Sequence, residues 1–277
     1  MIAVIEIGSN TVKFLVSENG GTVRETFVPL RLSAGLADTG RISPEMFSRA
    51  VDGFKGLKEE AEGLGADKVV CVATAVLRQA DNGAEFMAAV REECGLDIRI
   101  LSGEEEGRVS FAATAADFGE DILVCDIGGA STELVTASEA VSLPLGVVKV
   151  TEMFKDPEEA YNHLLSLMPK GFTGSKFVAV GGTAVSFAKL IRPKENPHGA
   201  KITRGALEDM FNILSAAGAE QRREMMPFDP HRADVIAAGG IILRAALDAF
   251  DFSEFYVSTK GVRHGVAATE ENNRRCE

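Results

Sequence analysis

The 277-residue sequence has no tryptophan, two tyrosines, four cysteines and four histidines. It contains neither a C-x-x-C pair nor an H-E-x-x-H motif, so a zinc site is not indicated. Cys71 and Cys125 lie within apolar runs, where a cysteine most often behaves as a small hydrophobic residue. We therefore expect four reduced thiols, as in cytoplasmic proteins.

Long hydrophobic segments are also missing. The longest apolar run, residues 235–243, ends at Arg244, whereas a helix that spans a membrane needs about 20 residues. The N-terminus has no basic segment and continues directly into a strand pattern, so it does not resemble a signal peptide. These absences predict a cytoplasmic protein without a membrane partner.

Positive charge is scarce. Lysine and arginine total 29, against 41 aspartates and glutamates, which gives a formal net charge of −12. Binding of nucleic acid depends on a basic face that neutralises phosphates, so no nucleic-acid partner is expected. An anionic ligand would need a local site made of backbone amides, a few cations or a bound metal.

The remaining composition is that of an ordinary globular protein, with 45% hydrophobic and 25% charged residues. Apolar runs bounded by turn residues predict strands at 4–7, 12–17, 22–30, 68–73, 97–101, 122–127, 132–136, 140–144, 177–180 and 255–257. Helices are predicted at 43–62, 85–93, 102–117, 204–216, 231–249 and 262–272, and a further helix opens at 181–183. Ser43 and Pro44 form one helix start, and Ser102 with Glu105 forms a capping box at another.

An internal repeat suggests two domains. Residues 4–15 (VIEIGSNTVKFL) and 124–135 (VCDIGGASTELV) superimpose at an offset of 120, and each comprises a strand, an acidic residue, a glycine-containing turn and a returning strand. The simplest architecture is two α/β domains of similar design that face each other across a cleft. The expected domains are residues 1–119 and 120–261, with the final helix, 262–277, a candidate to pack back on the first.

Three glycine-containing turns are candidate phosphate sites. Glycine lets backbone N–H groups converge on an anion because no Cβ blocks the approach. The turn at 181–183 precedes a helix N-terminus, where unbonded amides and the helix dipole favour a phosphate. A single glycine-containing turn is most often a plain hairpin. Two equivalent turns, together with a third between a strand and a helix, are harder to explain as plain hairpins. The candidate phosphate-binding residues are Ser9, Asn10, Thr11, Lys13, Gly128, Gly129, Ser131, Gly181, Gly182 and Thr183.

Acidic residues accompany two of these turns. Asp126 ends an apolar strand, where an unpaired carboxylate would be costly. It either accepts hydrogen bonds from its own turn or helps to hold a hard cation such as Mg²⁺, which takes one or two protein carboxylates together with waters and substrate oxygens. Asp126 and Glu133 could provide such carboxylates from one hairpin, and Glu6 could face these two residues from the other domain. The three residues are candidate Mg²⁺ ligands.

Other charged residues are ambiguous from residue type alone. Glu104, Glu105 and Glu106 begin a helix, where acids suit the helix dipole, and Glu105 completes the capping box. Their positions do not choose a general base among the three. Arg78 follows a buried strand and is either a surface residue or a phosphate clamp; Lys13 is equally ambiguous.

The motifs together resemble a known family. Eight segments occur in the order IEIGSNTVKFLV, ATAVLR, RILSGEEEGR, VCDIGGASTELV, LPLGVVKVTE, VAVGGTAVSFA, HRADVIAAGGIIL and VSTKGVRHGVA. Nearly the whole chain resembles the exopolyphosphatase / guanosine pentaphosphate phosphohydrolase (Ppx/GppA) family of the actin-like, sugar-kinase and heat-shock ATPase superfamily. The resemblance implies two ribonuclease-H-like domains with the substrate in the cleft between them. It also implies release of the terminal phosphate of inorganic polyphosphate, or of the 5′-γ-phosphate of pppGpp, with water and Mg²⁺.

The resemblance also implies roles for particular residues. The family's general base falls on Glu106, its phosphate-binding arginine on Arg78, and its acidic pair on Asp126 and Glu133. Its phosphate turns fall on Gly128, Gly129, Ser131, Gly181, Gly182 and Thr183. The expected catalytic residues are therefore Glu106, which activates the water, and Arg78.

The sequence departs from the family at three positions. Glu6 stands where aspartate is usual, Lys13 where arginine or histidine is common, and Ala130 where a glycine is usual. Lysine offers a point charge instead of a planar fork, so these differences bear on metal geometry and substrate choice more than on the fold. The sequence lacks the C-terminal helical extension of the long members and so resembles the short, two-domain type.

Three functions stay open at this point. The first is a phosphohydrolase acting on polyphosphate or pppGpp, and the second is a nucleotide-dependent kinase or ATPase of the same superfamily. The third is a non-catalytic sensor that binds polyphosphate or a guanosine nucleotide. The glutamate at the helix start favours water as the acceptor. The sequence does not choose between polyphosphate and pppGpp, and it is compatible with a homodimer.

Overall fold

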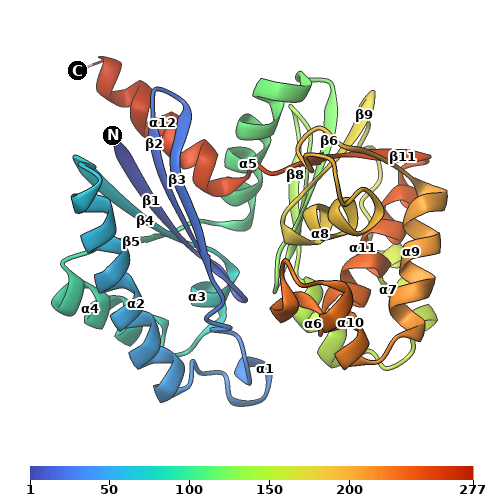
Figure 1. Cartoon of the computed structure of the whole chain (residues 1–277), viewed down its shortest axis with the longest axis horizontal. Helices are drawn as coiled ribbons and strands as arrows, with labels where there is room; N and C mark the ends of the chain where they lie inside the picture. Colours follow the sequence, from blue (N-terminus) through green and yellow to red (C-terminus); the bar gives the residue numbers. More distant parts are fainter. Residues whose placement is uncertain (277) are drawn as a thin grey trace. The chain divides into compact units, whose positions relative to one another are not determined.

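The computed structural model describes residues 1–276. It contains two compact units, one made of Met1–Ala113 together with the chain from Val262 onward, and the other of Thr114–Gly261. Each unit is built on one mixed sheet with helices packed against it (Figure 1). The first unit's sheet is called sheet A and the second unit's sheet B.

Sheet A has five strands in the order β3-β2-β1-β4-β5. β1 (Ile2–Ile7), β2 (Val12–Glu18) and β3 (Gly21–Val28) form an antiparallel meander, and β4 (Lys68–Ala73) and β5 (Ile98–Ile100) extend it in parallel. The helices of the first unit are α1 (Leu36–Thr39), α2 (Pro44–Gly63), α3 (Ala75–Gln79), α4 (Gly83–Cys94), α5 (Gly103–Phe118) and α12 (Val262–Cys276). The last residues of α5 belong to the second unit.

Side chains alternate between two buried faces along β1. Ala3 and Ile5 pack with α2 and α4, whereas Ile2 and Val4 pack with Val266 of α12. Figure 1 shows α2 and α4 on one side of sheet A and α12 on the other. Because successive side chains of a strand point to opposite faces, the next even-numbered residue of β1, residue 6, lies on the α12 face.

Sheet B repeats this topology and adds one edge strand, in the order β10-β11-β9-β6-β7-β8. Its strands are β6 (Ile122–Ile127), β7 (Thr132–Val135), β8 (Ala140–Leu143), β9 (Lys176–Val180), β10 (Lys201–Thr203) and β11 (Glu254–Ser258). As in sheet A, the first three strands are antiparallel; β9 and β11 run parallel to β6, and the added edge strand β10 is antiparallel to β11. The fold is α/β, with two ribonuclease-H-like units, as the sequence resemblance implied.

The helices of the second unit are α6 (Val147–Met153), α7 (Pro157–Leu167), α8 (Gly182–Ile191), α9 (Arg204–Ala216), α10 (Ala219–Met225), the 3-10 helix η1 (Pro230–Arg232) and α11 (Ile236–Ala249). Helix α11 is mostly buried and packs against α6, α7, α8 and α9. Buried side chains of α11, such as Ile242 and Leu247, join the core formed by sheet B.

Most predicted elements are confirmed, including the two helix starts. The Ser43 side chain accepts the N–H of Met46 at 3.3 Å, and the capping box of Ser102 and Glu105 forms as predicted. Cys71 and Cys125 are buried in the two cores, and burial raises the pKa of the Cys71 thiol to about 12.

The prediction of one helix over 231–249 is wrong at its start. The chain forms η1 first, and α11 begins only at Ile236. Pro230 favours a tight turn because its ring fixes φ at about −65°, and the Arg232 N–H donates to the carbonyl of Asp229 at 3.2 Å. The short helices α1, α3, α6, α7 and α10 were not predicted. Arg78 therefore lies within α3, which follows β4.

Within residues 1–276, no helix combines the length and the apolar character that crossing a membrane requires.

Candidate functional site

The two repeated hairpins close in the same way. The Gly8 N–H donates to the carbonyl of Thr11 at 3.2 Å, and the Gly128 N–H donates to the carbonyl of Ser131 at 3.0 Å. A Cβ would lie 2.8 Å from that oxygen at Gly8 and 3.0 Å from it at Gly128. The close approach requires glycine at residue 8 and favours it at residue 128, and the repeat in the sequence is a repeat in structure.

The carbonyl groups of each turn accept hydrogen bonds from a neighbouring segment, which we call its backing segment: residues 31–33 for the first turn and the start of α6 for the second. In the first hairpin, the carbonyls of Ser9 and Asn10 accept N–H groups from residues 31–33 at 2.9–3.1 Å. In the second, the carbonyls of Gly128 and Gly129 accept N–H groups from the start of α6 at 2.8–3.0 Å. The carbonyl and the N–H of a trans peptide point in opposite directions, so the N–H groups of these peptides face away from the backing segments. Amides arranged in this way suit an anion.

The third glycine turn follows β9 and lies beside the end of β6. Gly181 has a φ of 95°, which is the left-handed region that favours glycine. A Cβ there would meet the Ile127 carbonyl at 2.8 Å and Oδ1 of Asp126 at 3.3 Å. The Asp126 carboxylate therefore lies beside the N-terminus of α8, where the first N–H groups have no partner within the helix.

The start of α8 also carries a cation that the sequence analysis did not identify. A Cβ on Gly182 would overlap the guanidinium of Arg232, whose Nε donates to Oδ2 of Asp229 at 3.0 Å. The guanidinium therefore covers the backbone at Gly182, and η1 holds it there. In the sequence, this contact is marked by Gly182, whose missing side chain makes room for the guanidinium.

Thr183, at the third glycine turn, has a buried side chain. The side chain is 1% exposed and packs against Gly239 of α11, where a Cβ would meet Thr183 Oγ1 at 2.7 Å. Within the described residues, that hydroxyl has no hydrogen-bond partner. The Thr183 N–H lies in the first turn of α8.

Two acids lie opposite each other in the second hairpin. Asp126 and Glu133 are cross-strand partners on β6 and β7, with exposed fractions of 8% and 1%. The Ser142 hydroxyl donates to Oε1 of Glu133 at 2.7 Å. Like charges at directly opposed positions destabilise a sheet, and carboxylate oxygens are the ligands that Mg²⁺ prefers. This donor set fits a divalent cation.

The protein alone would fill only part of such a coordination sphere. Among residues 1–276, no three or more histidine, cysteine, aspartate or glutamate side chains gather in a metal-binding group. Mg²⁺ commonly takes one or two carboxylates and completes its octahedron with water and substrate oxygens. The pair Asp126 and Glu133 matches that number of protein ligands.

The equivalent position in the first hairpin does not fit a metal. Glu6 lies opposite Lys13, whose Nζ donates to Oε1 at 2.5 Å, and the Arg263 N–H donates to Oε2 at 3.2 Å. Burial alone would raise the pKa of Glu6, but the charges of Lys13 and Arg263, together with these hydrogen bonds, hold that pKa below its usual value. Both carboxylate oxygens are thus engaged by cationic residues of the protein.

The structure separates the three glutamates at the start of α5. Glu105 forms the capping box, in which it accepts the Ser102 N–H at 2.7 Å and so has a lowered pKa. Glu104 is exposed, whereas the Glu106 side chain is 10% exposed. Oε2 of Glu106 lies 3.2 Å from Nη1 of Arg78.

Arg78 and Glu106, the two predicted catalytic residues, thus lie together in the first unit. Nη1 of Arg78 also donates to the carbonyl of Leu101, at the end of β5. Both contacts use Nη1, which leaves Nη2 and Nε of the guanidinium for another acceptor. Arg78 can therefore orient the Glu106 carboxylate and still donate to a phosphate.

Comparison with known proteins identifies the family. A model of the Ppx/GppA phosphatase family matches residues 16–274. The sequence is 26% identical to exopolyphosphatase 1 of Mycobacterium tuberculosis (strain ATCC 25618 / H37Rv), over 96% of this chain and 86% of that protein. The crystal structure of the Aquifex aeolicus Ppx/GppA family member is similar with a TM-score of 0.82 and 28% identity, covering 99% of this chain and 98% of that one.

A crystal structure of an exopolyphosphatase from Cytophaga hutchinsonii has the same fold, with a TM-score of 0.89, 20% identity and coverage of 98% of each chain. The family match spans almost the whole chain, from the later part of β2 into α12, and includes the second glycine hairpin and the turn before α8. The chain therefore belongs to the Ppx/GppA phosphatase family.

Proposed function

We propose that this protein is an exopolyphosphatase that releases the terminal phosphate of inorganic polyphosphate, with pppGpp as the second candidate substrate. The observation that carries the proposal is the pair of buried acids Asp126 and Glu133, of which Asp126 lies beside the N-terminus of α8. It combines carboxylates for a divalent cation with amides for a phosphate. The similarity to proteins named exopolyphosphatase supports the choice of substrate.

The glycine turns bind the terminal phosphate in this proposal. The N–H groups that face away from the backing segments donate to phosphate oxygens, as do those of the first turn of α8. Arg232 adds a positive charge at Gly182. Because the net charge of the protein is −12, a polyanion is recognised locally and not by a broad basic surface.

Asp126 and Glu133 would hold Mg²⁺. When bound, the metal neutralises charge on the phosphate and leaving-group oxygens. Ser142 fixes the Glu133 carboxylate through its hydrogen bond to Oε1, which keeps the side chain in one orientation. Glu6 takes no part in metal binding, since Lys13 and Arg263 engage its carboxylate.

Glu106 acts as the general base. Its carboxylate accepts a proton from water while the water oxygen attacks the terminal phosphorus in line with the leaving oxygen. The bond between that phosphorus and the bridging oxygen breaks, and orthophosphate leaves together with a chain shortened by one phosphate. Arg78 keeps the base oriented and donates its remaining N–H groups to the transferred phosphate.

The test is phosphate release from polyphosphates of several lengths, pppGpp and ATP, with and without Mg²⁺. Glu106→Gln is expected to reduce kcat by about 10²- to 10⁴-fold, the usual contribution of a general base. Glu104→Gln is the matched control, because it makes the same change two residues away on an exposed side chain, and it should leave kcat within about twofold of the parent.

Three results would contradict parts of the proposal. An equal loss of kcat in both variants would show that Glu106 is not the general base. Faster turnover of pppGpp than of polyphosphate would make pppGpp the preferred substrate. Tight binding of polyphosphate without release by the parent protein would indicate a sensor instead of an enzyme.

A further inference from the structure

The first hairpin contains a buried ion pair that has no role in the reaction proposed above. Glu6 of β1 and Lys13 of β2 are cross-strand partners, and both lie on the face of sheet A that α12 covers. Glu6 is 3% exposed, whereas the Lys13 side chain is 26% exposed. The pair therefore joins a buried carboxylate to an ammonium group that a ligand can reach.

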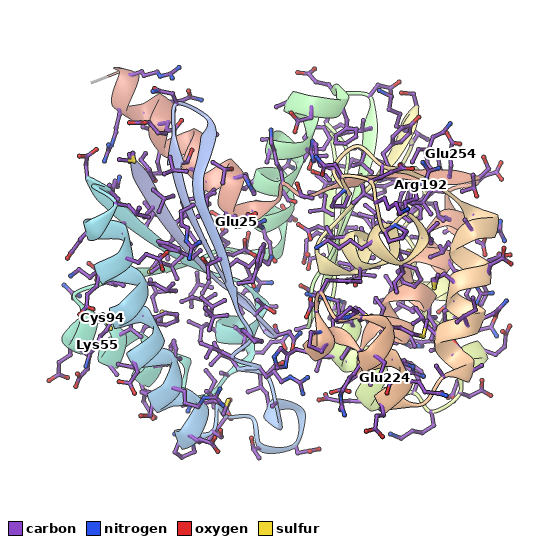
Figure 2. The ribbon with its side chains drawn as sticks, viewed as in Figure 1. Glu25, Lys55, Cys94, Arg192, Glu224 and Glu254 are labelled. Atoms are coloured by element: carbon purple, nitrogen blue, oxygen red, sulfur yellow. The ribbon has the colours of Figure 1, made fainter. Side chains whose placement is uncertain are left out.

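Residues of α12 and β3 complete this cluster. The Arg263 side chain is 6% exposed, and its Nη1 lies 3.9 Å from Oε2 of Glu6. Its Nε donates to Oε1 of Glu25 at 2.6 Å, and the guanidinium lies over the ring of Phe27, 5.2 Å from its centroid. Glu25 lies on β3 and is labelled in Figure 2. Two cations, Lys13 and Arg263, thus lie with two acids, Glu6 and Glu25, and Nε2 of His264 lies 3.7 Å from Oε1 of Glu25.

Glu6 also caps α12. Arg263 is the second residue of that helix, and its N–H is one of those that have no partner within the helix. This N–H donates to Oε2 of Glu6 at 3.2 Å, and a carboxylate at a helix N-terminus interacts favourably with the helix dipole. One carboxylate therefore fixes the start of α12 through Oε2 and Lys13 through Oε1.

We propose that Glu6 is a positioning residue that holds the ammonium of Lys13 beside the first glycine turn for a condensed phosphate, and that it is not a metal ligand. Lys13 follows the turn residue Thr11 by two positions on β2. An ammonium held in one place loses less conformational freedom when it meets a phosphate than a mobile one does. The inference rests on the proposed function for the identity of the ligand, but the holding of Lys13 does not.

The first test measures the holding of Lys13 and needs no enzymatic activity. Acetic anhydride labelling with mass spectrometry should show Lys13 reacting at least threefold faster in Glu6→Gln than in the parent protein. Glu6→Asp restores the charge and should return the rate toward that of the parent. Lys55, which is paired with Glu93 on distant helices, is the internal control and should not change. Equal Lys13 rates in Glu6→Gln and the parent would overturn the proposal.

The second test separates substrate positioning from metal binding. With tripolyphosphate at about 0.15 M salt, where loose surface charges are screened, Glu6→Gln and Lys13→Met should each raise KM several-fold with little change in kcat. The double variant should resemble Lys13→Met alone, because both changes remove the same contact. The Mg²⁺ concentration for half-maximal activity should stay within twofold of the parent, whereas Asp126→Asn should raise it strongly.

Two outcomes would overturn the inference. A KM for Glu6→Gln at or below that of the parent would show that the position of Lys13 does not matter to the substrate. A shift in Mg²⁺ dependence as large as that of Asp126→Asn, accompanied by weaker Mn²⁺ binding in calorimetry, would make Glu6 a metal ligand. If the parent protein releases no phosphate, the proposed function fails, while the labelling result and the tripolyphosphate Kd still decide the role of Glu6.

Discussion

The two glycine hairpins share a backbone and differ in charge. Both close through a glycine N–H and pair an acid with the residue seven positions later on the opposite strand. In the first hairpin the pair is Glu6 with Lys13, and in the second it is Asp126 with Glu133. The first pair joins opposite charges, whereas the second places two acids opposite each other. We propose that the residue opposite the acid decides which hairpin binds a metal: Lys13 balances Glu6 in the first, and Glu133 joins Asp126 as a ligand in the second.

Exchanging that residue tests the comparison with the largest expected effect. Glu133→Lys gives the second hairpin the acid–lysine pair of the first, so the introduced ammonium would occupy the cation position. We expect Mg²⁺-dependent phosphate release to fall by about 100-fold or more, with the protein still folded by circular dichroism. Mg²⁺-dependent release close to the parent's would mean that the metal does not bind at this hairpin.

The reciprocal exchange should cost stability instead. Lys13→Glu leaves the buried Glu6 opposite a second acid. Breaking a buried ion pair costs about 3–5 kcal/mol, and because Lys13 is partly exposed we expect a loss of about 2 kcal/mol. Urea unfolding measures it, with Lys55→Glu as a control at an exposed pair. A loss no larger than that of the control would show that the Glu6–Lys13 pair contributes little to the fold.

A smaller change sharpens the account of the second hairpin. Ser142→Ala removes the hydroxyl that orients Glu133. Loss of such an orienting group typically weakens metal binding by about 10- to 100-fold, and we expect the lower end, about tenfold, in the Mg²⁺ concentration for half-maximal activity. Ser138→Ala, in the turn between β7 and β8, is the control. Unchanged Mg²⁺ dependence in Ser142→Ala would separate Glu133 from the metal.

Local features of the fold followed from the sequence, and long-range contacts did not. The hairpins, β4 and the capping box at Ser102 were predicted because alternation, glycine turns and capping residues act over a few neighbouring positions. The choice of Glu106 from the run of three glutamates needed the family resemblance, since its contact with Arg78 joins segments 28 residues apart.

The environments of Glu6 and Arg232 were beyond sequence reasoning. Glu6 meets Arg263 across 257 positions, and no periodicity within β1 indicates that α12 begins beside it. Arg232 reaches Gly182 because η1 interrupts what the sequence suggested to be one helix. In both cases a distant element supplies the partner, and only the missing side chain at Gly182 marks one of the two contacts in the sequence.

The Glu6–Lys13 pair is balanced within the first hairpin, and we propose that the Asp126–Glu133 pair of the second hairpin binds a cation. Urea unfolding in EDTA tests it directly by comparing Glu6→Gln with Glu133→Gln. We predict opposite signs: Glu6→Gln destabilises the protein by about 2 kcal/mol, while Glu133→Gln relieves like-charge repulsion and stabilises it by about 0.5 kcal/mol. Added Mg²⁺ should stabilise the parent and Glu6→Gln but not Glu133→Gln. Equal destabilisation by both variants in EDTA, with the same Mg²⁺ response, would contradict the account.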